Sequence, residues 1–142
     1  MTTIAILGSG IMGSALSVPL ADNGHDVRLV GTHLDREIID SVKATGVHPG
    51  LQVKLPDTVR PYQLEDAEAA FQGAEVVLSG VNSFGVSWAG EQLARLLQPG
   101  MQVIAIAKGM QANEQGDLRI LPEVLMEQVP ACLLYTSPSP RD

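Results

Sequence analysis

Cysteine is almost absent from this sequence. The only one is Cys132, close to the end of the chain, so the sequence offers neither a disulfide framework nor several thiolate ligands for a metal. No apolar run approaches the roughly 20 residues that a transmembrane helix requires. The opening Met1-Thr2-Thr3 lacks the basic residues that begin a secretory signal peptide. We therefore expect a cytoplasmic protein without disulfides, a metal centre or a membrane span.

Positive charge is also scarce. Lysine and arginine together number 9 against 16 aspartates and glutamates, which gives a net charge of −7. A surface this acidic is a poor match for nucleic acid or for an anionic membrane. Hydrophobic residues nonetheless make up 45% of the 142 residues, enough for one domain with a well-buried core. The composition favours a domain that binds a small molecule.

Short apolar runs alternate with stretches of helical periodicity. The runs are typical of strands covered on both faces, and we expect them at Thr3–Leu7, Val27–Val30, Glu75–Ser79 and Val103–Ala107. Helical stripes are expected from Met12 to Leu20, Leu34 to Val42, Ala67 to Phe71, Trp88 to Leu97 and Leu118 to Val129. Prolines and glycines from His48 to Pro61 indicate an irregular excursion with short extended pieces. The alternation predicts an α/β fold, a doubly wound parallel sheet of the Rossmann type.

A glycine-rich motif, Gly8-Ser9-Gly10-Ile11-Met12-Gly13, joins the first expected strand to the first helix. Gly8 permits the tight turn, Gly10 lets the backbone approach a pyrophosphate, and Gly13 lets the helix pack closely on the sheet. The helix then directs unpaired N–H groups and the positive end of its dipole toward the phosphates. This arrangement predicts a site for NAD or NADP, and the alternative is a tight turn without a ligand.

The residues after the second strand bear on which dinucleotide is bound. Folds that prefer NAD usually place a carboxylate there to bind the ribose hydroxyls, but none follows Val30 until Asp35. His33 and Arg36 are therefore placed to face the 2′-phosphate of NADP, which a guanidinium can bind bidentately. The alternative is that Arg36 pairs with Asp40 on the exposed face of one helix. The pattern favours NADP over NAD.

Two later strands are followed by polar residues that bear on substrate chemistry. Lys108 follows the run Val103–Ala107, and Asn82 follows the strand Glu75–Ser79. Ligands of an open parallel sheet collect at the carboxyl ends of its strands, so Lys108 is placed to meet an anionic substrate beside the nicotinamide. Asn82 could bind the nicotinamide ribose or a phosphate. The alternatives are a surface lysine at position 108 and a helix cap at Ser83.

Taken together, these segments resemble the opening of NAD(P)-dependent glycerol-3-phosphate dehydrogenase. The similar segments are Gly8–Leu16, Asn23–Leu29, Pro49–Leu51 with Leu55–Pro56, Glu75–Ser79 with Val81–Ser83, and Ala107–Gly109. The sequence departs from the family at two positions, because the family commonly has proline where Asn82 stands and often an aromatic residue where Met12 stands. The resemblance covers the stretch before Ala131 and implies that this stretch is the family's cofactor domain.

The resemblance also implies roles for individual residues. Ile11 and Met12 would line the cofactor cleft, and Thr32 or His33 would approach the adenosine ribose. Lys108 would contact both the nicotinamide end of the cofactor and the phosphorylated substrate, which is dihydroxyacetone phosphate or glycerol 3-phosphate.

We expect the dinucleotide-binding domain to span residues 1–131. The resemblance implies that the general-base lysine and a helical substrate domain, through which a homodimer would form, lie beyond Ala131. No catalytic residue is then expected before that point, and this stretch alone should not turn over. Residues 132–142 resemble the translated end of a sequencing adapter, and Ser137–Asp142 offers nothing apolar to pack.

Two other functions remain open from the sequence. Ketopantoate reductase has a similar glycine motif, but it would place a lysine near Asn82 and an Asn-Gly pair near Lys108, and this chain has neither. The second alternative is a Rossmann module that senses a nucleotide without catalysis.

Overall fold

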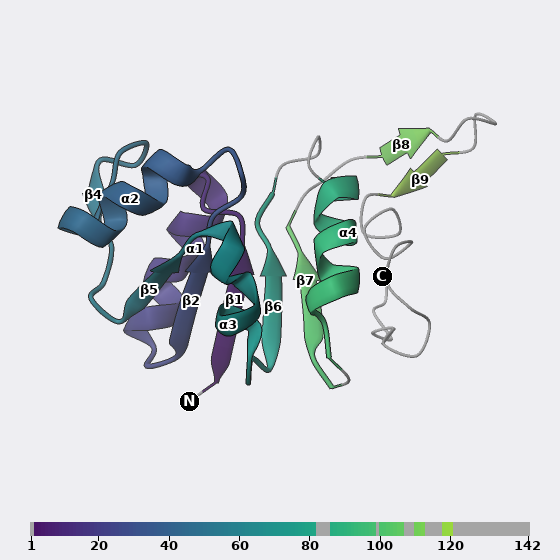
Figure 1. Cartoon of the computed structure of the whole chain (residues 1–142), viewed down its shortest axis with the longest axis horizontal. Coiled ribbons are helices and arrows are strands. Elements are labelled where there is room, and N and C mark those ends of the chain that lie inside the picture. Colours follow the sequence, from purple (N-terminus) through teal and green to yellow (C-terminus); the bar gives the residue numbers. More distant parts are fainter. Residues whose placement is uncertain (1, 82–85, 99, 107–109, 113–117, 121–142) are drawn as a thin grey trace.

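The computed structural model describes residues 2–81, 86–98, 100–106, 110–112 and 118–120. A five-stranded parallel sheet lies at the centre, in the order β5 (Val59–Tyr62), β2 (Asp26–Val30), β1 (Thr3–Leu7), β6 (Val76–Ser79) and β7 (Gln102–Ala105). The helices are α1 (Ile11–Asp22), α2 (Arg36–Thr45), α3 (Ala67–Phe71) and α4 (Val86–Leu96). The first two cover one face of the sheet and the last two cover the other (Figure 1). The predicted doubly wound α/β fold is confirmed.

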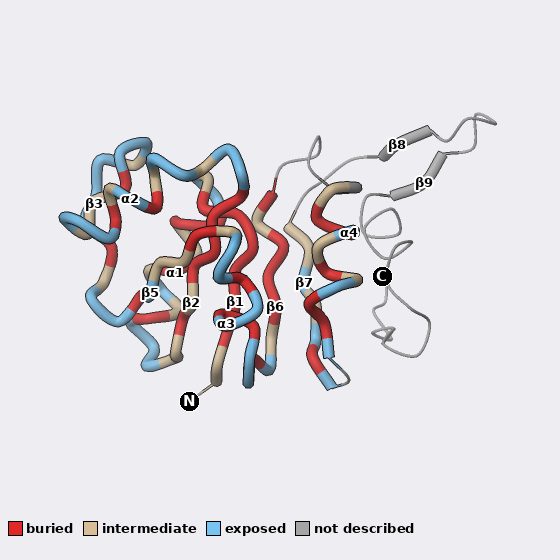
Figure 2. Tube along the Cα trace, viewed as in Figure 1, coloured by how far each residue is buried: buried red, intermediate tan, exposed pale blue. Residues whose placement is uncertain are grey.

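Each face of the sheet has its own apolar core, and the central strands are the most deeply buried part of the chain (Figure 2). Successive residues of a strand point to opposite faces. Accordingly, Ala5 and Leu7 of β1 pack in the core beneath α3 and α4, while Ile4 and Ile6 pack in the core beneath α1. Burial on both faces explains why these strands appear in the sequence as unbroken apolar runs.

Helix α1 packs on the sheet mainly through small residues, and the stripe predicted for it was only partly right, because Leu16 and Leu20 pack against the core but are only partly buried. The buried positions are Gly13, Ser14, Ser17 and Ala21, whereas Met12 is largely exposed. The buried hydroxyls of Ser14 and Ser17 each donate to a backbone carbonyl, which satisfies them within the interface. Small side chains let the helix backbone approach the strands more closely than a leucine stripe would.

Helix α2 follows the predicted pattern except at its beginning. Ile39 and Val42 are buried, and Gly46 ends the helix in the left-handed conformation with a φ of +80°. Leu34 was assigned to the apolar stripe, but it precedes the helix and is 82% exposed. The helix begins only at Arg36, so the periodicity of the sequence extended one turn too far.

The excursion after α2 contains a strand of the main sheet that the sequence analysis did not identify. It opens with a hairpin of β3 (Val47–His48) and β4 (Val53–Lys54), and β5 then pairs in parallel with β2. Pro61 lies within β5 and cannot donate to a sheet ladder, but β5 is an edge strand in the described sheet, where proline is tolerated.

The expected helix from Leu118 to Val129 was wrong at its beginning. Leu118–Ile120 forms strand β9, which pairs antiparallel with β8 (Met110–Ala112). Residues 121–129 lie outside the described part of the chain. An apolar spacing of a few residues cannot separate a helix from a strand whose partner lies in another segment.

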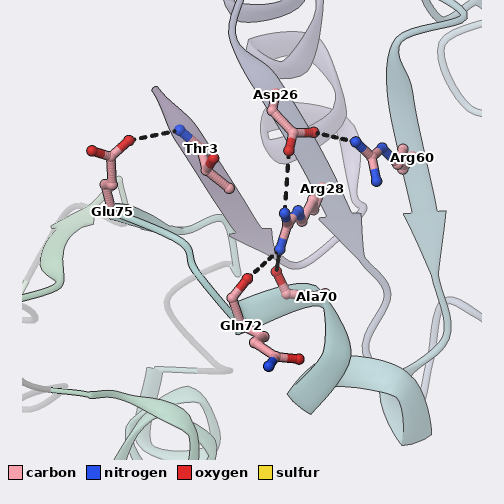
Figure 3. A network of polar contacts seen from close by, with 7 residues as sticks. All are labelled: Thr3, Asp26, Arg28, Arg60, Ala70, Gln72 and Glu75. Atoms are coloured by element: carbon pink, nitrogen blue, oxygen red, sulfur yellow. Dashed lines mark hydrogen bonds and ion pairs between the residues drawn. The ribbon is translucent and has the colours of Figure 1, made fainter. Parts of the chain in front are cut away.

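The short helix α3 is fixed to the sheet by a charged group from β2. The Arg28 guanidinium donates to the carbonyl oxygens of Ala70, at 3.1 Å, and Gln72 (Figure 3). It also pairs with Asp26 at 3.2 Å, and Asp26 in turn pairs with Arg60 of β5 at 3.3 Å. A cation at the carboxyl end of a helix stabilises its free carbonyls. The network therefore joins α3 to strands β2 and β5.

Truncation of Phe71 should strongly destabilise the fold. Its side chain is 1% exposed in the core between the sheet and helices α3 and α4. Replacement by alanine should lower the free energy of unfolding by about 3–5 kcal/mol, because it removes buried apolar contacts and leaves a cavity. Urea unfolding followed by circular dichroism measures this. Leu34→Ala is the matched control and should change stability by less than about 0.5 kcal/mol. Equal losses in both variants would contradict the assigned core.

Candidate functional site

The glycine motif lies at the carboxyl edge of the sheet, at the point where the chain changes direction across it. From β1 the chain continues to β2 on one side, and it later returns to β6 on the other side. Such a switch point opens a crevice above the ends of two neighbouring strands, which is where doubly wound sheets bind ligands. The loop from Gly8 to Gly10 borders this point and leads directly into α1.

The geometry at Gly8 and Gly13 agrees with the tight turn and the close helix packing that the sequence predicts for them, and the approach of Gly10 to a pyrophosphate remains a prediction. Gly8 has a φ of +109°, and a Cβ there would lie 3.0 Å from the carbonyl carbon of Gly80. A Cβ on Gly13 would lie 2.1 Å from the Gly8 carbonyl oxygen, so this contact between α1 and β1 requires glycine. At Gly10, by contrast, a Cβ would meet no atom of the described residues within 4 Å. The backbone of Gly10 therefore borders open space.

The backbone N–H groups in the first turn of α1 are not capped by a side chain. Gly10 is the N-cap residue and provides no side chain to cap the helix, and the first turn holds no acidic residue. Ser9 is fully buried, and among the described residues its hydroxyl has no hydrogen-bond partner. Ile11 and Met12 are 50% and 59% exposed beside the loop. Uncapped N–H groups and an apolar rim suit an anion that is attached to a larger organic molecule.

Asp35 is a site residue that the sequence analysis did not include. One of its carboxylate oxygens accepts hydrogen bonds from the N–H groups of Ser9, at 3.1 Å, and Thr32, at 3.0 Å. This carboxylate therefore joins the glycine loop to the residues after β2, and it brings Thr32 next to the motif. The sequence signal was its position just before α2, from which a side chain can reach back across the turn.

Arg36 pairs with a partner that neither hypothesis named. Its guanidinium makes two hydrogen bonds to Glu65, at 2.8 and 2.9 Å, and both side chains are exposed. The alternative of an Arg36–Asp40 pair was wrong, because Asp40 instead accepts a hydrogen bond from Gln63 at 3.0 Å. The segment that carries Glu65 lies beside α2 only after folding. The hydrogen bond from Arg36, together with the nearby positive charge, lowers the pKa of Glu65 to about 2.

His33 extends from the loop after β2 toward helix α4. Its ring and that of Trp88 lie with their centroids 5.2 Å apart and their planes tilted by 60°. His33 is exposed and Trp88 is partly buried, so the pair lies at the surface. The contact connects two segments that border the switch point.

The imidazole of His48 also contacts the glycine loop. The ring is 1% exposed, and its Nε2 lies 2.8 Å from the carbonyl oxygen of Ser9. In the sequence this histidine was interpreted as a loop residue. Its contact with a segment 39 residues away in the chain could be found only in the folded structure.

The roles of the predicted site residues toward a cofactor or substrate remain predictions. Asn82 and Lys108 lie outside the described residues. The strands that precede them are described, and β6 and β7 are neighbours in the sheet, with Ser79 opposite Ala105. Both strands run in the same direction as β1, so their carboxyl ends lie at the edge that carries the glycine motif.

Among the described residues no helix has both the length and the apolar character to cross a bilayer. Within that same set, no three histidine, cysteine, aspartate or glutamate side chains gather as a metal site would require.

The chain matches one protein family over nearly its whole length. The family is described as "NAD-dependent glycerol-3-phosphate dehydrogenase N-terminus", and the match covers residues 3–136. This agrees with the resemblance inferred from the motifs and decides against the ketopantoate reductase alternative.

Individual relatives give the same result. The NADP(+)-dependent glycerol-3-phosphate dehydrogenase of Archaeoglobus fulgidus is 44% identical over 75% of this chain and 31% of its own length. The glycerol-3-phosphate dehydrogenase [NAD(P)+] of Desulfitobacterium hafniense is 36% identical over 92% of this chain and 35% of its own. The crystal structure of glycerol-3-phosphate dehydrogenase from Coxiella burnetii superimposes with a TM-score of 0.75 at 28% identity, over 89% of this chain and 37% of that one. The chain thus spans about a third of the length of these relatives.

The Arg36–Glu65 pair should give Glu65 an unusual titration. Its folded pKa of about 2 lies below the ordinary 4.5, so the pair stabilises the fold above about pH 4.5 and loses this effect as the pH falls toward 2. Because both side chains are exposed, the effect on stability should be small. Carboxyl ¹³C NMR measures the pKa directly, and Arg36→Ala should return it toward 4.5. Arg60→Ala is the control, since Arg60 pairs with Asp26. A Glu65 titration unchanged in Arg36→Ala would contradict the assignment.

Proposed function

Because this chain belongs to the NAD-dependent glycerol-3-phosphate dehydrogenase family, as its N-terminal part, we propose that it is the cofactor-binding half of such an enzyme. The full-length protein would transfer a hydride between NAD(P)H and dihydroxyacetone phosphate or glycerol 3-phosphate. The relatives are about three times as long as the matched stretch. Residues 1–131 by themselves would then bind the cofactor without turnover, and the general base and the dimer contacts would come from further chain. We expect this enzyme to act in the cytoplasm.

The observation that supports the proposal best is the open space beside Gly10 at the uncapped beginning of α1. A Cβ at this position would meet no described atom within 4 Å, whereas at Gly8 and Gly13 it would approach backbone atoms to 3.0 and 2.1 Å. The residues present therefore fit a pyrophosphate, because the loop is closed against its own sheet and open on the ligand side. The buried hydroxyl of Ser9 adds a polar group without a described partner next to the same loop.

Different residues of the chain would bind different parts of the cofactor. The nicotinamide supplies the hydride chemistry when the cofactor is bound. The N–H groups at the beginning of α1 would bind the phosphates, and the exposed side chains of Ile11 and Met12 would line the cleft. Thr32 and His33 would approach the adenosine ribose. Asn82 would bind the nicotinamide ribose or a phosphate.

Lys108 would bind the substrate in this scheme. In the sequence it comes shortly after β7. The carboxyl end of β7 lies at the edge of the sheet that carries the glycine motif. An ammonium group there would attract the phosphorylated substrate. It would also stabilise the carbonyl oxygen, which becomes more negative as the hydride arrives.

We further propose that NADP(H) is preferred to NAD(H). The A. fulgidus relative is named NADP(+)-dependent, and Arg36 stands at the beginning of α2, beside the loop that would hold the ribose. Its pairing with Glu65 is an exposed ion pair, which is a weak interaction that a phosphate can replace. A 2′-phosphate accepts the same two parallel hydrogen bonds from a guanidinium that a carboxylate accepts.

Arg36→Ala should therefore weaken NADPH binding by about tenfold and NADH binding by less than about twofold, because only NADPH carries the 2′-phosphate. The measurement is a titration of the 142-residue chain with each reduced cofactor, followed by nicotinamide fluorescence.

Two control variants accompany this titration. Glu65→Gln should leave NADPH binding as tight as before or tighter, because it frees the guanidinium. Arg60→Ala should change neither affinity. Tighter binding of NADH than of NADPH, unaffected by Arg36→Ala, would disprove the preference.

Lys108→Ala in the full-length protein should reduce turnover of dihydroxyacetone phosphate by roughly a hundredfold to a thousandfold, with cofactor affinity nearly unchanged. The reason is that a donor aimed at developing charge acts mainly in the transition state. Lys108→Arg should not restore turnover, because a planar guanidinium does not replace a compact ammonium. Steady-state kinetics and the cofactor dissociation constant of each variant measure this.

The matched control is Lys54→Ala. Lys54 is an exposed lysine of strand β4 that lies 3.9 Å from Asp57, so its loss should leave the kinetics unchanged. Turnover near that of the unmodified enzyme in Lys108→Ala would show that Lys108 is a surface residue.

A further inference from the structure

Every hydrogen-bonding atom of the His48 ring has a partner. Its Nδ1 accepts hydrogen bonds from the N–H groups of Gly50 and Leu51, both at 3.1 Å. Because Nδ1 accepts, it carries no proton, and the neutral ring must carry its proton on Nε2. Nε2 therefore donates to the carbonyl oxygen of Ser9 at 2.8 Å. The two N–H groups of the hairpin thus determine which nitrogen donates to the glycine loop.

The hairpin that carries His48 packs against the end of the glycine loop, where helix α1 begins. A Cβ on Gly50 would lie 3.0 Å from the Cδ1 atom of Ile11 and 3.1 Å from the Cε1 atom of His48. A side chain at this position would require the side chains of Ile11 and His48 to shift by a few tenths of an ångström. The hairpin therefore packs closely against the side chain of Ile11 at the beginning of α1.

The carbonyl of Ser9 has two donors and hence a fixed direction. Besides His48, the hydroxyl of Ser14 donates to it at 2.8 Å. The Ser9 carbonyl and the Gly10 N–H belong to one peptide group, which is planar and trans, so they point in opposite directions. No described residue accepts a hydrogen bond from the Gly10 N–H, and Gly10 borders open space.

We propose that His48 is a positioning residue of the cofactor site. By holding the Ser9 carbonyl, it turns the Gly10 N–H away from the hairpin and toward the phosphates of the dinucleotide. The proposal rests on the proposed function, since it assumes that a phosphate binds at this loop. It adds a role that the motif does not contain, because His48 lies far outside the glycine-rich segment.

Two substitutions separate the role in the loop from the role in the hairpin. The amide nitrogen of His48→Gln can reach the position of Nε2 and donate to Ser9. The amide oxygen of His48→Asn can take the place of Nδ1 and accept from Gly50 and Leu51, but this side chain is too short to reach Ser9. His25→Asn is the matched control, because His25 Nδ1 also accepts a backbone N–H, that of Thr2, at the opposite edge of the sheet.

The experiment measures the dissociation constant of NADPH and the thermal midpoint of unfolding for the 142-residue chain and its three variants. His48→Asn should raise the dissociation constant by about tenfold, the expected effect of losing one orienting hydrogen bond. His48→Gln should stay within about threefold of the unmodified chain, and His25→Asn should not change the constant.

The outcomes distinguish the proposal from its premise. If the unmodified chain binds NADPH and His48→Asn binds it equally well, the positioning role is wrong. If the affinities of all variants fall only in proportion to their thermal midpoints, His48 is merely structural and the proposal is also wrong. Absence of NADPH and NADH binding by the unmodified, folded chain would instead overturn the proposed function, and with it the proposal.

Discussion

The contact between Gly13 and the carbonyl of Gly8 is the constraint on which the rest of this structure depends. A Cβ at residue 13 would lie 2.1 Å from that oxygen, so the beginning of α1 can approach the end of β1 this closely only with glycine there. The same closeness explains why the buried positions of α1 are glycine, serine and alanine, while Leu16 and Leu20 are only partly buried. It also places the uncapped N–H groups of the helix directly above the switch point of the sheet, where a phosphate would bind.

The loop between these two glycines is held from several directions. Asp35, which follows β2, accepts the N–H of Ser9, while His48 of the hairpin and Ser14 of α1 donate to its carbonyl. Because both the N–H group and the carbonyl of Ser9 are hydrogen-bonded, the two peptide groups that flank this residue have little freedom to rotate. A binding loop that is already oriented loses less conformational entropy when its ligand arrives. The polar residues around the motif thus order the loop, and the backbone of Gly10 borders open space.

The sequence predicted best those parts of the fold that depend on local pattern. Strands covered on both faces, such as Thr3–Leu7, leave unbroken apolar runs, and the short helix Ala67–Phe71 was predicted with its observed bounds. Strand β5 was missed because it contains Pro61 and forms only by pairing with β2. The beginning of the last expected helix was wrong for the same kind of reason, since β9 forms by pairing with β8. In both cases the partner strand lies in another segment of the chain, where periodicity carries no information.

The glycine motif was determined by the sequence alone, because its requirements are those of the backbone. The positive φ of Gly8 and the close helix contact at Gly13 each exclude a side chain, and only glycine meets both requirements. The partners of the surrounding polar groups were decided by the tertiary structure. Arg36 pairs with Glu65 instead of Asp40, and His48 reaches Ser9 across 39 residues. A charged or polar side chain can bond to any complementary group within reach, and only the folded chain determines which groups are within reach.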